Sequence, residues 1–442
     1  MAVGPGPIRT APIALLSVVV LWLLIGPRIE IASVGGSSVR FEDFLLLGVG
    51  LYVIRNWPLI RAEKLVRRGI GLVVLVSLLA AGIGTLTGRV HLGSSLLYSL
   101  RPLEYWVIYP AVAVPLHKAG PKAFTWTVGV LIAVTCLNTF AAGLQFVGGI
   151  QLGYSNSSIS RGAGLTAGPY ELGALMAMLA CYWLYFRRYG LTVIAFAGLL
   201  MSLSRVSLLA GVVGVAVILI GQRFSKEPRI PSSKPKPLLV VGITLAAVAL
   251  IAVSPRIGNT LVRPALERTQ STSIVGSWQS AGIVVSTTPR QLTSDSYFET
   301  TYTGIGDYIL GATSSSDASN VVRFFRWQIL LREVTASPAN LSFGLGPSFA
   351  GASVDGTYVR IFVETGLLGL IAWGLMIAGW LKRRPLWLVA VVITMIVGSS
   401  FIDLLFALRP MVVLWILIAI SQYPSPAVTE ARQAAAVKTI GA

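Results

Sequence analysis

Arginines beside predicted membrane re-entry points are the side chains in this sequence best suited to chemistry. A guanidinium group stays charged, offers a planar fork of donors, and is easier to desolvate than an ammonium group when it meets phosphate oxygens. A cluster of such groups would suit a lipid diphosphate, whereas single arginines can instead pair with acidic neighbours or lipid headgroups. The candidates for diphosphate binding are Arg161, Arg205, Arg323 and Arg326, with Arg101 as a further substrate-binding candidate.

Three carboxylates are candidates for roles beside these arginines. Asp355 stands just before a long apolar segment and is the first candidate for a general base, because a carboxylate there can take the proton of an attacking hydroxyl. The alternative is that its charge only stabilises the N-terminus of the helix. Glu364, about two and a half helical turns deeper, needs a partner at such a depth. Glu171 is a further substrate-binding candidate, and Arg161 or Arg205 is its expected partner.

The remaining membrane charges and aromatic residues are expected to be mainly structural. Tyr358 is a substrate-binding candidate, although interfacial aromatic residues such as Tyr358 and Trp327 more often anchor helices than stack on sugars. Two local ion pairs are expected, between Arg101 and Glu104 and between Asp403 and Arg409.

Cofactor motifs are missing from the sequence. It contains no P-loop, GxGxxG pattern or aspartate-rich metal motif on the expected scaffold. We expect no cofactor and no metal, since fixed cations can stabilise a departing diphosphate. Cys136 and Cys181 lie inside apolar runs, so neither a disulfide framework nor a zinc-ligand spacing can be deduced from them.

The composition is that of an integral membrane protein, because 55% of residues are hydrophobic and only 12% are charged. We predict an all-α polytopic membrane protein with about twelve transmembrane helices. The predicted spans are 12–27, 41–54, 70–87, 94–116, 123–147, 168–186, 190–203, 206–221, 238–253, 357–381, 386–403 and 410–422.

Basic connections between alternate spans predict the orientation, with both termini in the cytoplasm. Every lysine then falls on the cytoplasmic side, and the basic residues on the outer side are all arginines. The net charge of +18 requires no nucleic-acid partner, since topology accounts for the inward basic residues.

The predicted domains are an N-terminal bundle at 1–253, a large extracytoplasmic loop at 254–356, C-terminal helices at 357–422 and a cytoplasmic tail at 423–442. The first part of the loop is rich in Ser, Thr and Gly, which predicts irregular chain with short strands around 273–286. An amphipathic helix is expected at 320–337, with Ser319 or Asn320 as its N-cap. Phe325, Ile329 and Leu330 would lie on the membrane surface while Arg323 and Arg326 point into a cavity, unless the helix merely rests on the bilayer.

Four segments together resemble the O-antigen polymerase and ligase superfamily of membrane enzymes. They are RGAGLTAGPYELGALMAMLA from Arg161, LSRVSLL around Arg205, the helix around Arg323 followed by FGLGPSF, and DGTYVRIFVETGLLGLIAW from Asp355. SLRPLEYWVIYP around Arg101 is a weaker match. The order of these segments covers roughly residues 100 to 381.

This resemblance implies transfer of a growing glycan from undecaprenyl diphosphate onto a second lipid-linked repeat unit. It also implies a bacterial cytoplasmic membrane, an extracytoplasmic active site, and a flippase or chain-length regulator as possible partners. Ligases of the superfamily resemble one another in a functional histidine where this chain has Asp355, and the histidines here are His91 and His117, which favours a polymerase. A ligase and a lipid-linked oligosaccharide transporter remain the alternatives.

Overall fold

The computed structural model describes residues 11–34, 37–58, 70–148, 150, 161–224, 274–303, 318–351, 354–382 and 384–423. Several predictions concern residues outside these ranges. They are the span at 238–253, the basic loops at 59–69 and 225–236, the loop segments 254–273 and 304–317, and the tail beyond 423.

Every predicted span inside the described residues is helical, with ends that agree within about four residues. The helices are α1 (Ala11–Ile25), α2 (Phe41–Arg55), α4 (Ile70–Leu86), α5 (Leu92–Trp106), α6 (Ile108–Ala119), α7 (Pro121–Gly148), α8 (Pro169–Tyr185), α9 (Tyr189–Met201), α10 (Arg205–Phe224), α19 (Thr357–Leu381), α20 (Leu386–Ser399) and α21 (Leu408–Gln422).

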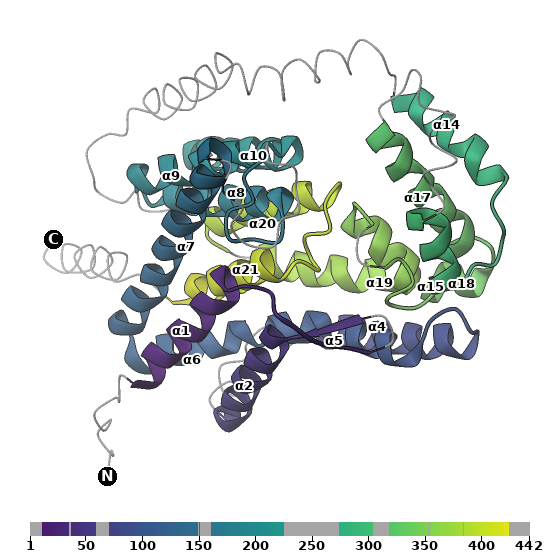
Figure 1. Ribbon diagram of the computed structural model, residues 1–442. Helices are drawn as coiled ribbons and strands as arrows, with labels where there is room; N and C mark the ends of the chain where they lie inside the picture. The colour runs from purple at the N-terminus through teal and green to yellow at the C-terminus, as the bar shows by residue number, and fades with distance from the viewer. Residues whose placement is uncertain are drawn as a thin grey trace, which may run out of the picture.

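Three of the described helices, α7, α10 and α19, are long and apolar enough to cross a membrane. Further apolar helices, including α1, α4, α9, α20 and α21, are shorter. Their packing buries a large apolar core in which α8 and α21 are enclosed almost completely. Figure 1 shows α8, α20 and α21 inside this bundle, with α7, α9 and α10 around them.

The structure differs from the predicted helices in two places: a short hairpin is present, and one predicted span is divided. Residues Glu30–Val34 and Ser37–Arg40 form strands β1 and β2 of an antiparallel hairpin between α1 and α2. The alternation of Ile29, Ile31 and other β-branched residues favours this hairpin. The predicted single span at 94–116 is divided into α5 and α6, because Pro110 has no N–H to donate to the carbonyl of Trp106.

The described part of the predicted outer loop is helical rather than irregular. It forms α14 (Ile274–Ser286), α15 (Ser294–Phe298), a π-helical turn (Glu299–Thr303), α17 (Ala318–Val334) and α18 (Pro338–Phe343). The expectation of strands around 273–286 is therefore wrong. Ala281 and Val285 lie one helical turn apart on α14 and are buried in a core shared with α17, and this contact stabilises the helix.

Helix α17 also differs in detail from its prediction. It begins at Ala318, so Ser319 and Asn320 lie inside the helix and neither is its N-cap. Residues of α14, α17 and α19 form a second apolar core, separate from the core of the bundle. This second core buries Phe325, Ile329 and Leu330, which therefore do not face a membrane surface, because α14 and α19 cover them. Figure 1 shows α14, α15, α17 and α18 together at one end of α19, α4 and α5.

Helix ends that the charge pattern assigned to one side of the membrane contact one another. Ion pairs and hydrogen bonds link residues 161–171, 202–205, 355–360 and 400–409, and Arg323 joins them through Asp355; we call this region the charged rim. At the other end of the bundle Lys118 Nζ donates to Asn56 Oδ1 at 3.0 Å, so the ends of α2 and α6 also meet.

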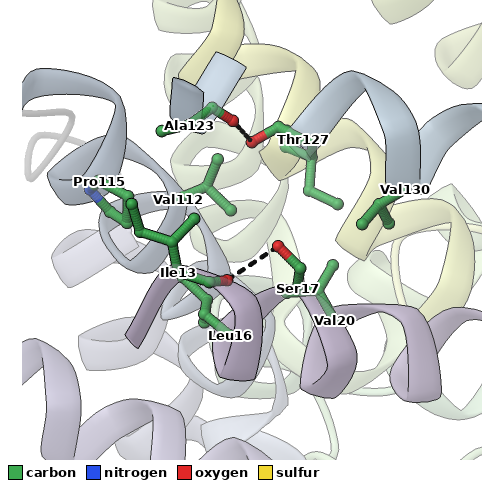
Figure 2. Close-up of a pocket in the computed structure, with 10 residues that line it drawn as sticks. Ile13, Leu16, Ser17, Val20, Val112, Pro115, Ala123, Thr127 and Val130 are labelled. Carbon is green, nitrogen blue, oxygen red and sulfur yellow. Dashed lines mark hydrogen bonds between the residues drawn. The ribbon is translucent and has the colours of Figure 1, made fainter. Parts of the chain in front are cut away.

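A cavity of about 20 Å³ lies away from the charged rim, between α1, α6, α7 and α21 (Figure 2). Its two hydroxyls are satisfied within their own helices, because Ser17 Oγ donates to Ile13 O at 2.9 Å and Thr127 Oγ1 donates to Ala123 O at 2.9 Å. The cavity therefore presents an apolar lining and contains none of the candidate site residues.

Candidate active site

Asp355 and Arg323 form the accessible part of the candidate site. Arg323 Nε lies 3.7 Å from Asp355 Oδ2, and the Asp355 side chain is 34% exposed. Asp355 has a φ of 53°, in the left-handed region, which aspartate tolerates better than most residues because its side chain is short and polar. The helix that follows begins at Thr357, so the carboxylate lies just before the first turn of α19. A hydroxyl can approach a carboxylate held in this position.

A buried ion pair lies directly below Asp355. Arg360 Nε is 2.8 Å from Asp403 Oδ2, and the Arg360 side chain is only 1% exposed. The guanidinium lies over the rings of Tyr98 and Phe406, at 5.8 and 5.2 Å from their centroids, and a second nitrogen donates to the carbonyl of Gly351. The pair therefore fixes the start of α19 against the turn between α20 and α21.

Asp403 connects this pair to the accessible carboxylate. Burial raises the pKa of the Asp403 carboxyl, the Arg360 guanidinium opposes this rise, and the charge of Asp355 adds to it. Thr357 Oγ1 donates to Ile402 O at 3.0 Å, which holds the two segments together. Two ion pairs, Arg323 with Asp355 and Arg360 with Asp403, thus lie next to each other with their carboxylates in electrostatic contact. The sequence did not indicate the second pair, because Arg360 and Asp403 lie in different elements.

Trp327 contacts the candidate site, although the sequence analysis expected this residue only to anchor a helix. Its Nε1 donates to Val354 O at 2.9 Å, and its ring stacks on Phe401 with centroids 6.4 Å apart. A Cβ added at Gly356 would approach the Trp327 ring to 3.0 Å. Trp327 therefore positions the backbone on both sides of Asp355.

Glu364 lies in a break of α19 rather than on the rim. Gly366 adopts a φ of 66° inside the helix, which releases carbonyls of the preceding turn. Leu345 N donates to Val363 O at 2.8 Å and Gly346 N donates to Glu364 O at 3.1 Å. The FGLGPSF and ETGLLG motifs therefore interlock, as the released carbonyls of one accept the amides of the other.

The Glu364 side chain is buried at this interlock. Arg360 is the opposing charge that acts on it, and its Oε1 has no hydrogen-bond partner among the described residues. The opposing charge of Arg360 is therefore the partner that the structure offers at this depth. A residue in this position can orient Arg360 but lies apart from the exposed carboxylate.

Arg161 and Arg205 meet at the turn between α9 and α10. Arg161 Nη2 donates to Leu203 O at 2.8 Å, and its guanidinium lies 5.0 Å from the ring centroid of Tyr170. Leu203 has a φ of 50°, a strained conformation for a branched residue. Arg205 follows immediately as the first residue of α10 and is exposed. Arg161 thus supports the turn that presents Arg205.

Glu171 pairs with different arginines from those expected. It lies 3.0 Å from Arg28 Nη2 and 3.5 Å from Arg409 Nη1, and also accepts the backbone N–H of Ala167. The expected pair with Arg161 or Arg205 is therefore wrong. The expected local pair of Asp403 with Arg409 is wrong as well, because Arg360 of α19 pairs with Asp403 and Glu171 of α8 pairs with Arg409.

The predicted ion pair between Arg101 and Glu104 is present, and Asp43 is a second partner of Arg101. Arg101 Nη1 lies 3.1 Å from Glu104 Oε2 and 2.8 Å from Asp43 Oδ1. Asp43 Oδ2 also accepts the N–H of Arg40 at the start of α2. These contacts tie α2 to α5 and leave Arg101 engaged by two carboxylates.

Two other candidates serve contacts between elements. Tyr358 Oη donates to Ile396 O at 2.8 Å, so it joins α19 to α20. Arg326 Nη2 donates to Thr301 O at 3.4 Å, whereas Arg323 Nε lies 3.7 Å from Asp355 Oδ2. Within the part of the chain that the structure describes, no group of three His, Cys, Asp or Glu residues is placed to hold a metal.

Removal of Arg360 is expected to destabilise the protein strongly, because it leaves the Asp403 charge buried without its main partner. Arg360→Met should lower the free energy of unfolding by about 3–5 kcal/mol, measured by chemical denaturation in detergent. Adding Asp403→Asn to this variant should recover much of the loss, because the uncompensated charge is then gone. Lys118→Met, which removes an exposed contact, should change stability by less than about 0.5 kcal/mol. Equal losses in the single and double variants would contradict this account of the pair.

In comparisons with known proteins, the chain matches no protein-family model and no curated sequence.

Proposed function

We propose that this protein is a membrane glycosyltransferase that polymerises lipid-diphosphate-linked oligosaccharide repeat units into a surface polysaccharide. The donor and acceptor would both be carried on undecaprenyl diphosphate, as the resemblance of its motifs to O-antigen polymerases implies. The proposed site lies on the extracytoplasmic side of the bacterial cytoplasmic membrane, with both termini in the cytoplasm. A flippase that delivers the repeat units and a regulator of chain length are the partners this activity would need.

The observation that carries this proposal is the pairing of an accessible carboxylate with arginines at the charged rim. Asp355 and Arg323 are partly exposed and lie within 3.7 Å of each other. The segment between α20 and α21 contacts both parts of the rim, because Asp403 pairs with Arg360 of α19 and Arg409 pairs with Glu171 of α8. A base and cations at one end of the bundle match the needs of glycosyl transfer from a diphosphate.

The proposed reaction uses groups that this rim supplies. The acceptor hydroxyl attacks the anomeric carbon of the donor sugar, and the bond between that carbon and the diphosphate oxygen breaks. The hydroxyl proton passes to the Asp355 carboxylate, while the electron pair of the broken bond leaves with the diphosphate. Arg205 and Arg323 compensate the charge that develops on the leaving diphosphate, and Arg161 supports the turn that carries Arg205.

Arg205→Ala is expected to lower the rate of polymer formation about a hundredfold, because one cation facing the leaving group is lost. Arg205→Lys should restore little of the activity if the bidentate fork matters. Arg161→Ala should act in the same direction through the Leu203 turn. Arg290→Ala, which changes an exposed arginine between α14 and α15, is the matched control and should behave like the unaltered protein. Polymer of normal length and yield in both alanine variants would refute the assignment.

The lipid-linked material that accumulates in cells lacking the protein tests the activity itself. Single repeat units on the lipid at the outer leaflet are expected, because flipping would continue while polymerisation stops. Finished lipid-linked polymer would indicate a ligase, and single repeats retained on the cytoplasmic leaflet would indicate a transporter. Either of these two results would contradict the proposal.

A further inference from the structure

Four aromatic rings form a continuous row from α14 to the turn after α20. Trp278 meets Phe324 nearly edge-on, with 5.5 Å between ring centroids. Phe324 meets Trp327 at 5.9 Å, and Trp327 stacks on Phe401 at 6.4 Å. The two end rings, Trp278 and Phe401, are 41% and 43% exposed. The row therefore remains accessible at both ends instead of closing into a core.

Polar side chains accompany this row on α17. Arg323 and Trp327 are one helical turn apart, as are Phe324 and Gln328, so the four share one stripe of the helix. The opposite stripe, with Phe325 and Ile329, is buried in the second core. Gln328 Nε2 donates to Trp278 O at 2.7 Å. The outward stripe thus alternates flat aromatic rings with planar groups able to form hydrogen bonds.

This combination matches the surface of a carbohydrate. A pyranose ring has an apolar face of C–H groups that packs on aromatic rings. Its hydroxyls accept hydrogen bonds from amide and guanidinium N–H groups and donate hydrogen bonds to amide oxygens. We propose that the row formed by Trp278, Phe324, Trp327 and Phe401 binds the glycan of the acceptor. This assignment rests on the proposed function and identifies where the acceptor sugars lie.

The position of the row favours a glycan over a membrane surface. Its third ring, Trp327, donates a hydrogen bond to the carbonyl of Val354, the residue before Asp355. A sugar chain along the row would therefore bring a hydroxyl toward that carboxylate. Arg323 and Asp355 border the same stripe, and an ion pair beside the rings is poorly suited to insertion into acyl chains.

Binding of a soluble oligosaccharide to the protein in lipid nanodiscs tests this inference. The probe is the repeat-unit oligosaccharide released by mild acid from lipid-linked material, and its Kd is measured by calorimetry. Trp278→Leu should raise the Kd about tenfold, because leucine keeps apolar contact with lipid but has no ring to stack. Trp278→Phe should restore most of the affinity. The control is Trp126→Leu, which alters an exposed tryptophan of α7 and should leave the Kd unchanged.

The outcomes separate this inference from the proposed function. An unchanged Kd in Trp278→Leu, or no measurable binding to the unaltered protein, overturns the glycan assignment. Equal increases in Trp278→Leu and Trp126→Leu also overturn it, because they indicate a general membrane contact. Ring-dependent binding by a protein that forms no polymer supports the glycan row and instead contradicts the polymerase proposal.

Discussion

Asp355→Asn is expected to lower the rate of polymer formation by about 10² to 10⁴-fold, the range typical of losing a general base. Asparagine keeps the size and the tolerance of the left-handed conformation at this position, but its amide cannot accept the hydroxyl proton. Lipid-linked repeat units should still bind, because the arginines of the rim are unchanged. The rate is measured with purified protein and saturating lipid-linked substrate.

Asp295→Asn is the matched control for this variant. Asp295 is an exposed carboxylate on α15 that lies 2.9 Å from His91 Nε2, away from the charged rim. Its loss should leave both the rate and the melting temperature unchanged. Near-normal transfer by Asp355→Asn would remove this carboxylate from the reaction, and a matching fall in both variants would point to a general effect of lost surface charge.

Gly366→Ala is expected to destabilise the protein strongly. A Cβ at this position would overlap the carbonyl of Ser342, and the φ of 66° is costly for any residue with a Cβ. Together the overlap and the strain should lower the free energy of unfolding by about 3 kcal/mol or more. The measurement is chemical denaturation of the purified protein in detergent.

Gly374 provides a control within the same helix. A Cβ there meets no atom within 4 Å, and the residue has ordinary helical geometry. Gly374→Ala should therefore leave stability unchanged or raise it by up to about 1 kcal/mol, because alanine is the better helix former. If both variants unfold alike, the break in α19 and its interlock with residues 344–346 do not have the importance assigned to them.

Hydropathy predicted the helices well because the signal is local. Apolar runs at 70–86, 121–148 and 357–381 are long, and each forms a helix close to its predicted bounds. The error at 274–286 has the same origin. Its Ile, Val and Ser residues suit a strand locally, yet burial of Ala281 and Val285 against α17 makes the segment a helix.

The charged partners could be predicted only where they lie on one helix. Arg101 and Glu104 are three positions apart, so their pairing follows from helical geometry. Glu171 and Arg409 belong to helices that only the tertiary packing brings together, and no pattern in the sequence relates them. The same holds for Arg360 with Asp403 and for Trp327 with Val354. The candidate residues were therefore recognisable by type, whereas their partners required the fold.

The most direct test of the central claim uses purified protein in proteoliposomes with lipid-linked repeat units as the sole substrate. The account predicts a ladder of polymer lengths without ATP or an ion gradient, with one lipid diphosphate released for each new glycosidic bond. Repeat units that remain single would contradict it. So would new bonds that appear only after a separate acceptor, such as a lipid core, is added.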